Sequence, residues 1–528
     1  QAESGNLSYS GSGSHILNNF GLIKKTTLAT SATINCDLIN SGTLQVEAGT
    51  MSLSDVNIQL NGGVYNVSTG AILEWGSILT VTGTLTGLVN GQIDWAGTVT
   101  VPTIAQWNFT GAGNINWSTG TLNGGGTATN NFVMNLSTSV NKSLAGATTF
   151  NNTGTINMVF SGDLYVTDGV LNNQPTGVID LQAVSGNLSY SGTGSHVMNN
   201  YGLIKRTTTA GLAIIENVFH NEGTIWVQSG TLNFNNPGIT LQNGIYNVDA
   251  GTFLTWNGTV ALSGTLTGTI PGEIVWYDTV RVEAANSAML AFTGSGNVNW
   301  TTGTITGGGS LTNQFTMRLT TSANKSLAGG TTFNNAALMY NQSSGDLYVT
   351  DGILNNLSTG TIDLRADSGN LSYSGTGSHI LNNFGLIKKT TTNGTTTIES
   401  DLVNTGTISV ENGTLVLGDP NIQLNGGTYN VATGTVFEWQ NTVTCSGTLG
   451  GLVSGTIRWT ANTAVTAAAT LDFTGSGLID WPSGTINGGG TLTNNFVIEL
   501  STSSNKSISG LTTFNNNGTM SMVFSTGP

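Results

Sequence analysis

The sequence predicts an all-β protein folded as a parallel β-solenoid, in which short strands stack turn upon turn. Three observations lead to this prediction: a long internal repeat, a shorter period inside it, and apolar residues that alternate with a period of two. We expect a right-handed solenoid with about 20–25 residues in each turn and essentially no α-helix.

The long repeat is marked by a glycine-rich stretch that carries one histidine and one basic pair. It occurs three times: GSGSHILNNFGLIKKTT (11–27), GTGSHVMNNYGLIKRTT (192–208) and GTGSHILNNFGLIKKTT (375–391). Its histidines, His15, His196 and His379, are almost equally spaced along the chain. The chain therefore divides into three copies, the third truncated: residues 1–183, 184–366 and 367–528. We expect one continuous solenoid rather than three separate domains, and a segment of a longer array.

The shorter period places a glycine once in each turn, with equal steps from Gly21 to Gly42 and from Gly42 to Gly63. A strand with alternating apolar residues follows each glycine. One such turn cannot bury its inward face, whereas turns stacked about 4.8 Å apart pair every strand with the strands above and below it. About eight turns fit in each copy. The main alternative, three β-sandwich domains, does not account for corner residues that repeat with so short a period.

The corners of the turns carry the glycines and the asparagine pairs. We expect the glycines there because they adopt the left-handed backbone conformation at little cost. One corner departs from the pattern, since Ala337 stands where the other copies have Gly154 and Gly518. The asparagine pairs are placed to stack as hydrogen-bonded ladders from turn to turn. These pairs include residues 18–19, 151–152 and 172–173.

The composition restricts the possible partners. Only 8% of the residues are charged and the net charge is −14, which disfavours binding to nucleic acid or to an anionic membrane surface. No apolar run reaches the ~18 residues needed to cross a bilayer, so we predict no direct membrane insertion of this segment. Cys36 and Cys445 do not occupy equivalent positions of the repeat, and we predict two isolated thiols rather than a disulfide framework.

The positions of the tryptophans indicate whether the solenoid has a sugar-binding face. Nine of the eleven form equivalent sets: Trp75, Trp256, Trp439; Trp95, Trp276, Trp459; Trp117, Trp300, Trp481. Each of the three in the first copy lies two residues after an aliphatic residue, as Trp95 follows Ile93. Alternation therefore places the tryptophans on the inward face with the aliphatic residues, as an interior aromatic stack. An outward platform for glycans is the alternative.

The remaining candidates for chemistry are weak. No second histidine or cysteine lies within a turn of the three equivalent histidines, which favours a structural or surface role over a metal site. Asp163 with Asp168, and their counterparts Asp346 and Asp351, could share a calcium ion, but the glycine-rich repeat of calcium-loaded rolls is absent. We predict no cofactor and no metal site.

The most distinctive external feature is a basic pair that recurs once in each copy. Its residues are Lys24, Lys25, Lys205, Arg206, Lys388 and Lys389. We predict a solvated strand end here, with weak surface contact to a glycan or another partner as the alternative role.

Two further functions are disfavoured. Polysaccharide lyases and hydrolases need grouped carboxylates, but the acidic residues here are dispersed and differ between copies, since Glu74 aligns with Thr255. We therefore predict that the chain is not an enzyme. Ice binding needs regular Thr-x-Thr ladders, and the threonine triplets here are irregularly spaced.

Three runs carry a resemblance to a known family: FNNTGTINM (150–158), LVNTGTISVENGTLVL (402–417) and NGGTYNVATGTVFEW (425–439). They resemble the repeat regions of giant bacterial cell-surface adhesins, most of all those of Bacteroidetes, including gliding flavobacteria. The resemblance implies an extracellular, bacterial cell-surface location. It implies a structural or adhesive filament segment that acts by length, rigidity and weak multivalent contacts with surfaces or glycans, and that stacks on neighbouring repeats of the same polypeptide. A glycan-binding β-helix with repeated sites is the alternative.

Overall fold

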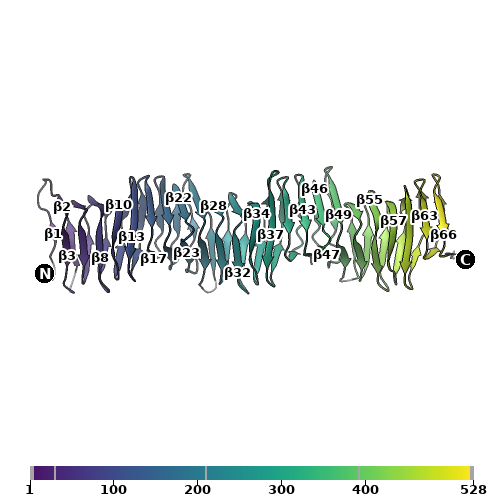
Figure 1. Ribbon diagram of the computed structural model, residues 1–528, viewed down its shortest axis with the longest axis horizontal. Coiled ribbons are helices and arrows are strands. Elements are labelled where there is room, and N and C mark those ends of the chain that lie inside the picture. Colours follow the sequence, from purple (N-terminus) through teal and green to yellow (C-terminus); the bar gives the residue numbers. More distant parts are fainter. Residues whose placement is uncertain (1–4, 29–30, 209–210, 391–392, 524–528) are drawn as a thin grey trace. The chain divides into compact units, whose positions relative to one another are not determined.

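The structure, a computed structural model, describes residues 5–28, 31–208, 211–390 and 393–523. It is an all-β parallel β-solenoid with about 23 turns. The predicted fold class is confirmed, and the described residues contain strands, turns and bends but no helix. Accordingly, none of them belongs to a helix long and apolar enough to span a membrane. Figure 1 shows the short strands following one another turn by turn.

The internal contacts divide the chain into two compact units. Unit one comprises residues 1–259 and 267–273, and unit two comprises residues 260–266 and 274–528. The division falls inside the second sequence copy, at β34 (Val260–Thr269) and β35 (Glu273–Trp276). Both units are built alike, from three columns of parallel strands through which the chain passes in turn.

In unit one, we number the columns by their first strands. Column 1 contains β1 (Leu7–Ser8), β4 (Ser31–Asn35), β7 (Thr50–Leu53), β9 (Ile72–Trp75), β11 (Gln92–Trp95), β14 (Asn114–Trp117), β17 (Val133–Leu136), β20 (Thr155–Met158), β23 (Val178–Leu181), β26 (Leu203–Arg206), β29 (Thr224–Val227) and β32 (Ile245–Val248). Column 2 contains β2 (Leu17–Asn19), β5 (Leu38–Asn40), the first halves of β8 (Ile58–Val67) and β10 (Ile78–Leu88), β12 (Thr98–Thr100), β15 (Gly120–Asn123), β18 (Lys142–Leu144), β21 (Leu164–Val166), β24 (Leu188–Ser189), β27 (Leu212–Ile215), β30 (Thr231–Phe234) and β33 (Phe253–Trp256). Column 3 contains β3 (Leu22–Lys25), β6 (Thr43–Val46), the second halves of β8 and β10, β13 (Ile104–Thr110), β16 (Thr127–Asn130), β19 (Thr148–Asn152), β22 (Gly169–Asn173), β25 (His196–Asn200), β28 (Val218–Asn221) and β31 (Ile239–Gln242).

Unit two repeats the arrangement, and we name its columns by letters. Column a contains β36 (Val280–Arg281), β39 (Gly303–Thr306), β42 (Lys325–Leu327), β45 (Leu347–Val349), β48 (Leu371–Ser372), β51 (Thr395–Ile398), β54 (Thr414–Leu417), β56 (Val436–Trp439), β58 (Thr456–Trp459), β61 (Leu478–Asp480), β64 (Val497–Leu500) and β67 (Thr519–Met522). Column b contains β37 (Ser287–Thr293), β40 (Ser310–Asn313), β43 (Thr331–Asn335), β46 (Gly352–Asn356), β49 (His379–Asn383), β52 (Asp401–Asn404), the first halves of β55 (Ile422–Val431) and β57 (Thr442–Leu452), β59 (Asn462–Ala464), β62 (Gly484–Asn487) and β65 (Lys506–Ile508). Column c contains β38 (Asn297–Trp300), β41 (Met317–Leu319), β44 (Leu338–Asn341), β47 (Thr361–Leu364), β50 (Leu386–Lys389), β53 (Thr407–Val410), the second halves of β55 and β57, β60 (Ala468–Thr474), β63 (Thr491–Asn494) and β66 (Thr513–Asn516).

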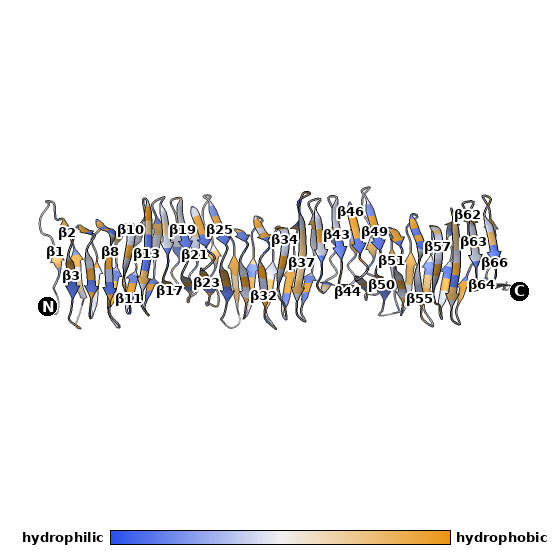
Figure 2. Cartoon of the chain, viewed as in Figure 1, coloured by the Kyte–Doolittle hydropathy of each residue, from blue (hydrophilic) through white to orange (hydrophobic). Residues whose placement is uncertain are grey.

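The interior of each unit is filled by apolar side chains from alternate strand positions. Hydrophobic and hydrophilic residues therefore alternate along the strands in Figure 2. All nine repeat-matched tryptophans are buried, eight of them with at most 1% of their surface exposed. The prediction of an interior aromatic stack is confirmed. Trp95 and Trp117 stack in parallel with ring centres 4.2 Å apart, and Trp459 and Trp481 lie 5.0 Å apart.

The second asparagine of each predicted pair faces inward and, together with other inward asparagines, forms the predicted ladders. In unit one, each buried amide nitrogen donates to the next amide oxygen at 2.6–2.9 Å, and the last donates to a tyrosine hydroxyl: Asn130, Asn152, Asn173, Asn200, Asn221, Tyr246. Unit two contains an equivalent ladder: Asn313, Asn335, Asn356, Asn383, Asn404, Tyr429. A buried polar side chain is tolerated here because each rung gives the next one its hydrogen-bond partner.

The corner glycines have two different explanations. Gly63 has a φ of 99°, so the left-handed prediction holds there. It is wrong for Gly42 and Gly223, which lie outside that region, and a Cβ atom on them would lie 2.4 and 2.3 Å from the carbonyl oxygen of the glycine one turn earlier. Close stacking of turns, rather than φ, excludes a side chain at these positions. Ala337 also lacks a positive φ, so its corner is not left-handed.

Both cysteines are free and buried, Cys36 in unit one and Cys445 in unit two, as predicted. Burial raises the pKa of both thiols, which keeps them protonated at neutral pH and therefore poorly nucleophilic.

Candidate functional site

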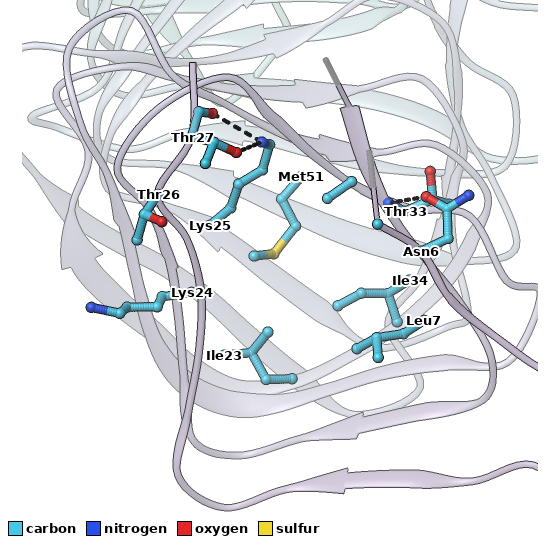
Figure 3. A pocket seen from close by; sticks show the side chains of 12 residues that line it. Asn6, Leu7, Ile23, Lys24, Lys25, Thr26, Thr27, Thr33, Ile34 and Met51 are labelled. Carbon is cyan, nitrogen blue, oxygen red and sulfur yellow. Dashed lines mark hydrogen bonds between the residues drawn. The ribbon is translucent and has the colours of Figure 1, made fainter. Parts of the chain in front are cut away.

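The two residues of each predicted basic pair point in opposite directions. Lys24 is exposed, whereas Lys25 is 5% exposed and donates from Nζ to the carbonyl oxygen of Thr27 at 3.0 Å. Figure 3 shows Lys25 directed towards Thr27 and Lys24 directed away from it, at a pocket lined also by Met51. Adjacent residues of a strand face opposite sides of the sheet, so a basic pair on a strand places one cation inside the wall.

The inner residue is buried in the other copies as well. Arg206 and Lys389 are fully buried, and both donate to backbone carbonyl groups of the preceding turn: Arg206 to Ala183 at 2.9 Å and Lys389 to Ala366 at 3.2 Å. The prediction that both residues of each pair are solvated is therefore wrong for Lys25, Arg206 and Lys389. Only the outer residues, Lys24, Lys205 and Lys388, remain candidates for surface contact.

The outer lysines are partly neutralised by acidic residues of neighbouring turns. Lys205 Nζ lies 3.0 Å from Asp180 Oδ2, and Lys388 Nζ lies 3.8 Å from Asp363 Oδ2. Lys24 is the more exposed of the three and lies 3.9 Å from the half-exposed Glu47. The basic spots are therefore small, which restricts them to weak contacts.

The copied sequence does not return to the same column of the solenoid. In unit one, Lys24 lies on β3 in column 3, whereas its counterpart Lys205 lies on β26 in column 1, the column of Trp95 and Trp117. In unit two, Lys388 lies in column c with Trp300, while Trp439 lies in column a. Within unit one, equivalent outer lysines of two successive copies therefore lie on different columns.

A second set of buried cations binds backbone carbonyl groups at an irregular corner of the solenoid. Lys142 is fully buried, and its Nζ donates to the carbonyl oxygens of Thr138 at 2.7 Å and Val140 at 2.6 Å. Its counterpart Lys325 donates to Thr320, to Thr321 at 2.9 Å and to Ala323 at 2.6 Å. These lysines satisfy carbonyl groups that no strand pairs, so their role is structural.

The buried lysines predict a rise in stability with pH. Burial lowers the pKa of Lys142 and Lys325 from 10.5 to about 8. Because lysines of the unfolded chain keep the higher value, the unfolded state binds more protons between these pH values, and the free energy of unfolding increases with pH there. We expect denaturant unfolding to show this increase from about pH 7.5 to about pH 9.5, below the range in which tyrosines ionise.

The matched control is the double variant Lys142→Met and Lys325→Met, whose unfolding free energy should depend less steeply on pH. The assignment is contradicted if the unfolding free energies of the wild type and the double variant depend equally on pH over the same interval.

The three equivalent histidines share one local arrangement. His15 Nδ1 lies 3.1 Å from the carbonyl oxygen of Gly13, and the ring stacks on Tyr9 with centres 4.0 Å apart. His196 and His379 have the same contacts, with a carbonyl oxygen at 3.0 Å and a stacked tyrosine. A carbonyl oxygen only accepts, so Nδ1 carries the proton and Nε2 is the nitrogen left to face other groups.

In two of the copies, Nε2 faces a pair of carboxylates from the next two turns. We call His15, Asp37 and Asp55 the first-copy cluster, and His379, Asp401 and Asp419 the third-copy cluster. In the first, Nε2 lies 3.2 Å from Asp37 Oδ1 and 3.8 Å from Asp55 Oδ2. In the third, the corresponding distances are 3.4 and 3.8 Å. The ligand atoms of each cluster all lie within 4.8 Å of one another.

Asp419 is the most deeply placed member, with 2% of its surface exposed. Burial raises the pKa of its carboxyl group to about 6; the nearby Asp401 adds to this rise, while the backbone N–H of Asn421 and the charge of His379 oppose it. Two carboxylate groups and one imidazole thus lie together at a corner of the solenoid that is partly shielded from water.

These clusters were missed in the sequence because only histidines and cysteines within one turn were considered as ligands. Asp37 follows His15 by one turn of the solenoid, and Asp55 follows it by two turns. The signal that could have found them is an acidic residue at the same corner of successive turns.

The aspartates considered for calcium serve different backbone groups. Asp163 Oδ1 accepts from the N–H of Asn187 at 2.9 Å, and Asp168 Oδ1 accepts from the N–H of Ser195 at 3.3 Å. In the second of these pairs, Asp346 accepts from Asn370 in the same way as Asp163. Each of these three carboxylates is thus engaged by the following turn.

No protein-family model matches the chain, and a search of curated proteins finds no significant match.

Proposed function

We propose that this chain is a structural and adhesive segment of an extracellular bacterial surface filament, which acts by reach, stiffness and weak multivalent contacts. The observation that carries the proposal is that Lys24 and Lys205, the same outer residue of two successive copies, lie on different columns of unit one. A binding site for one soluble substrate needs no such repetition, whereas a filament that touches other surfaces gains from contacts on every face.

The interior supports a mechanical role. Trp stacks and asparagine ladders tie each turn to its neighbours inside both units, and the strands pair continuously from turn to turn. Bending a unit would break several of these contacts at once, so stiffness follows from the same interactions that hold the fold.

Attachment by the outer lysines is tested with the triple variant Lys24→Gln, Lys205→Gln and Lys388→Gln. Because these side chains lie outside the wall, the variant should fold normally by circular dichroism and thermal unfolding. Beads coated with many copies of the wild-type chain should adhere to glycan-coated surfaces, with an avidity about 10²–10⁴ times the affinity of the single chain. The variant beads should adhere less.

The control is a triple variant with the charge kept, Lys24→Arg, Lys205→Arg and Lys388→Arg, which should retain adhesion. Equal adhesion of the Gln variant assigns these lysines no role and leaves a spacer function. Tight binding of a soluble glycan by the single chain, or cleavage of a polysaccharide, contradicts the proposal itself.

A further inference from the structure

We propose that the first-copy and third-copy clusters are two binding sites for a divalent transition-metal ion of the zinc class. Each cluster offers one imidazole nitrogen and two carboxylate oxygens from three consecutive turns. The inference is independent of the proposed function, since it rests only on the chemistry of these corners.

The histidine is oriented as a metal ligand. Its Nδ1–H donates to a backbone carbonyl, and its ring is held against a tyrosine, so Nε2 is the ring nitrogen that faces the two carboxylates. Metal-binding histidines commonly have this outer hydrogen bond, which sets the tautomer and fixes the ring.

One candidate ligand atom in the third-copy cluster lacks a hydrogen-bond donor. Asp419 Oδ1 accepts from the N–H of Asn421 at 2.7 Å, but among the residues that the structure describes, no group donates a hydrogen bond to the buried Oδ2. That oxygen lies 3.8 Å from His379 Nε2. A buried carboxylate oxygen without a donor is costly, and a cation bound between it and the other ligands would satisfy it.

The distances suit a small ion with mixed ligands. Zinc–nitrogen and zinc–oxygen bonds of about 2.0–2.1 Å place tetrahedral ligand atoms about 3.3 Å apart. The pairs His15 Nε2–Asp37 Oδ1 at 3.2 Å and His379 Nε2–Asp401 Oδ1 at 3.4 Å already have this separation. The second carboxylate oxygen of each cluster has to move about half an ångström closer to the histidine nitrogen. Calcium prefers six to eight oxygen ligands, so the imidazole argues against it.

The second carboxylates are supported alike, and the third-copy cluster is open to solvent. Asn57 donates its backbone N–H to Asp55 and its side-chain amide to Asp37, as Asn421 does to Asp419 and Asp401. A surface hollow lined in part by Tyr373, Glu399 and Asp419 adjoins the third-copy cluster.

The second copy is a natural comparison. His196 keeps its carbonyl and tyrosine contacts, but Val218 and Asn236 stand where the other copies have the two aspartates, and Gly238 replaces the supporting asparagine. All three changes fall on the positions that bind or support the ion. The same fold therefore exists with and without the ligand set.

The experiment uses the full chain, stripped of metal with a chelator, and titrated with Zn²⁺ by calorimetry. We expect two ions bound per chain, and one ion for either Asp55→Asn or Asp419→Asn. The double variant should lose both, with binding weakened by at least about tenfold. Co²⁺ should give the absorption bands of a low-coordinate nitrogen–oxygen site, which also disappear in the double variant.

The variants are matched to the fold, since the second copy already contains Asn236 at the substituted position. The gain-of-site variant Val218→Asp with Asn236→Asp should bind a third ion, and His220→Ala should change nothing. The proposal is overturned if the folded chain gives no binding heat with Zn²⁺ up to about 1 mM, if the aspartate variants bind as wild type does, or if Ca²⁺ binds more tightly than Zn²⁺.

Discussion

Replacing Trp95 by alanine is expected to lower the free energy of unfolding by about 3–5 kcal/mol. The side chain is fully buried, and it stacks on Trp117 with ring centres 4.2 Å apart and tilts against Trp107 at 5.7 Å. Its indole N–H donates to the carbonyl oxygen of Gly97 at 2.8 Å. Truncation removes these contacts and leaves a cavity that the stacked strands cannot close without shifting neighbouring turns.

The effect should be local, because each turn contacts only its neighbours. Hydrogen exchange measured by mass spectrometry should show faster exchange in β9, β11 and β14 than in distant strands, together with a lower denaturant midpoint. The control is Trp226→Ala, since Trp226 is only half-buried and donates to Asp249 Oδ1 at 3.1 Å. We expect Trp226→Ala to lower the free energy of unfolding by about 1 kcal/mol. Unchanged unfolding of the Trp95 variant, combined with lost glycan binding, would show that the tryptophan faces outward.

Replacing Asn152 by alanine is expected to lower the free energy of unfolding by about 2–4 kcal/mol. Asn152 is fully buried; its Oδ1 accepts from Asn130 and its Nδ2 donates to Asn173, both at 2.9 Å. Nδ2 also donates to the carbonyl oxygen of Val178 at 3.1 Å. The substitution therefore leaves a donor on the preceding turn without its acceptor and two acceptors on the following turn without this donor, in an interior that water cannot easily enter.

The adjacent Asn151 provides the matched control. It points outward and forms the outer ladder, where its Oδ1 accepts from Asn172 at 2.8 Å. Asn151→Ala should lower the free energy of unfolding by no more than about 0.5 kcal/mol, because water replaces the lost hydrogen-bond partner. Equal costs for the two neighbours, measured by denaturant unfolding, would contradict an inward ladder.

Much of the interior could be read from alternation alone. Trp95 shares its face with Ile93, and the second residue of each asparagine pair shares its face with the apolar residue two positions earlier, such as Phe150 before Asn152. The same rule, applied to Lys24 and Lys25, predicts one outward and one inward cation. The basic pair was misjudged because charge was given more weight than strand parity, although a long lysine side chain can bury its stem and bind carbonyl groups.

The sequence by itself determined the fold class, the inward tryptophans and the isolated cysteines, because these depend on patterns along one strand or on the period between strands. The tertiary structure decided which residues meet across turns. One copy of the repeat does not fill a whole number of turns, so the equivalent residues Lys24 and Lys205 lie on different columns of unit one. The same stacking brings His15 against Asp37 and Asp55, which the chain supplies from the next two turns. Such contacts depend on the geometry of all the corners that lie between the residues in the chain. A local sequence pattern does not contain this information.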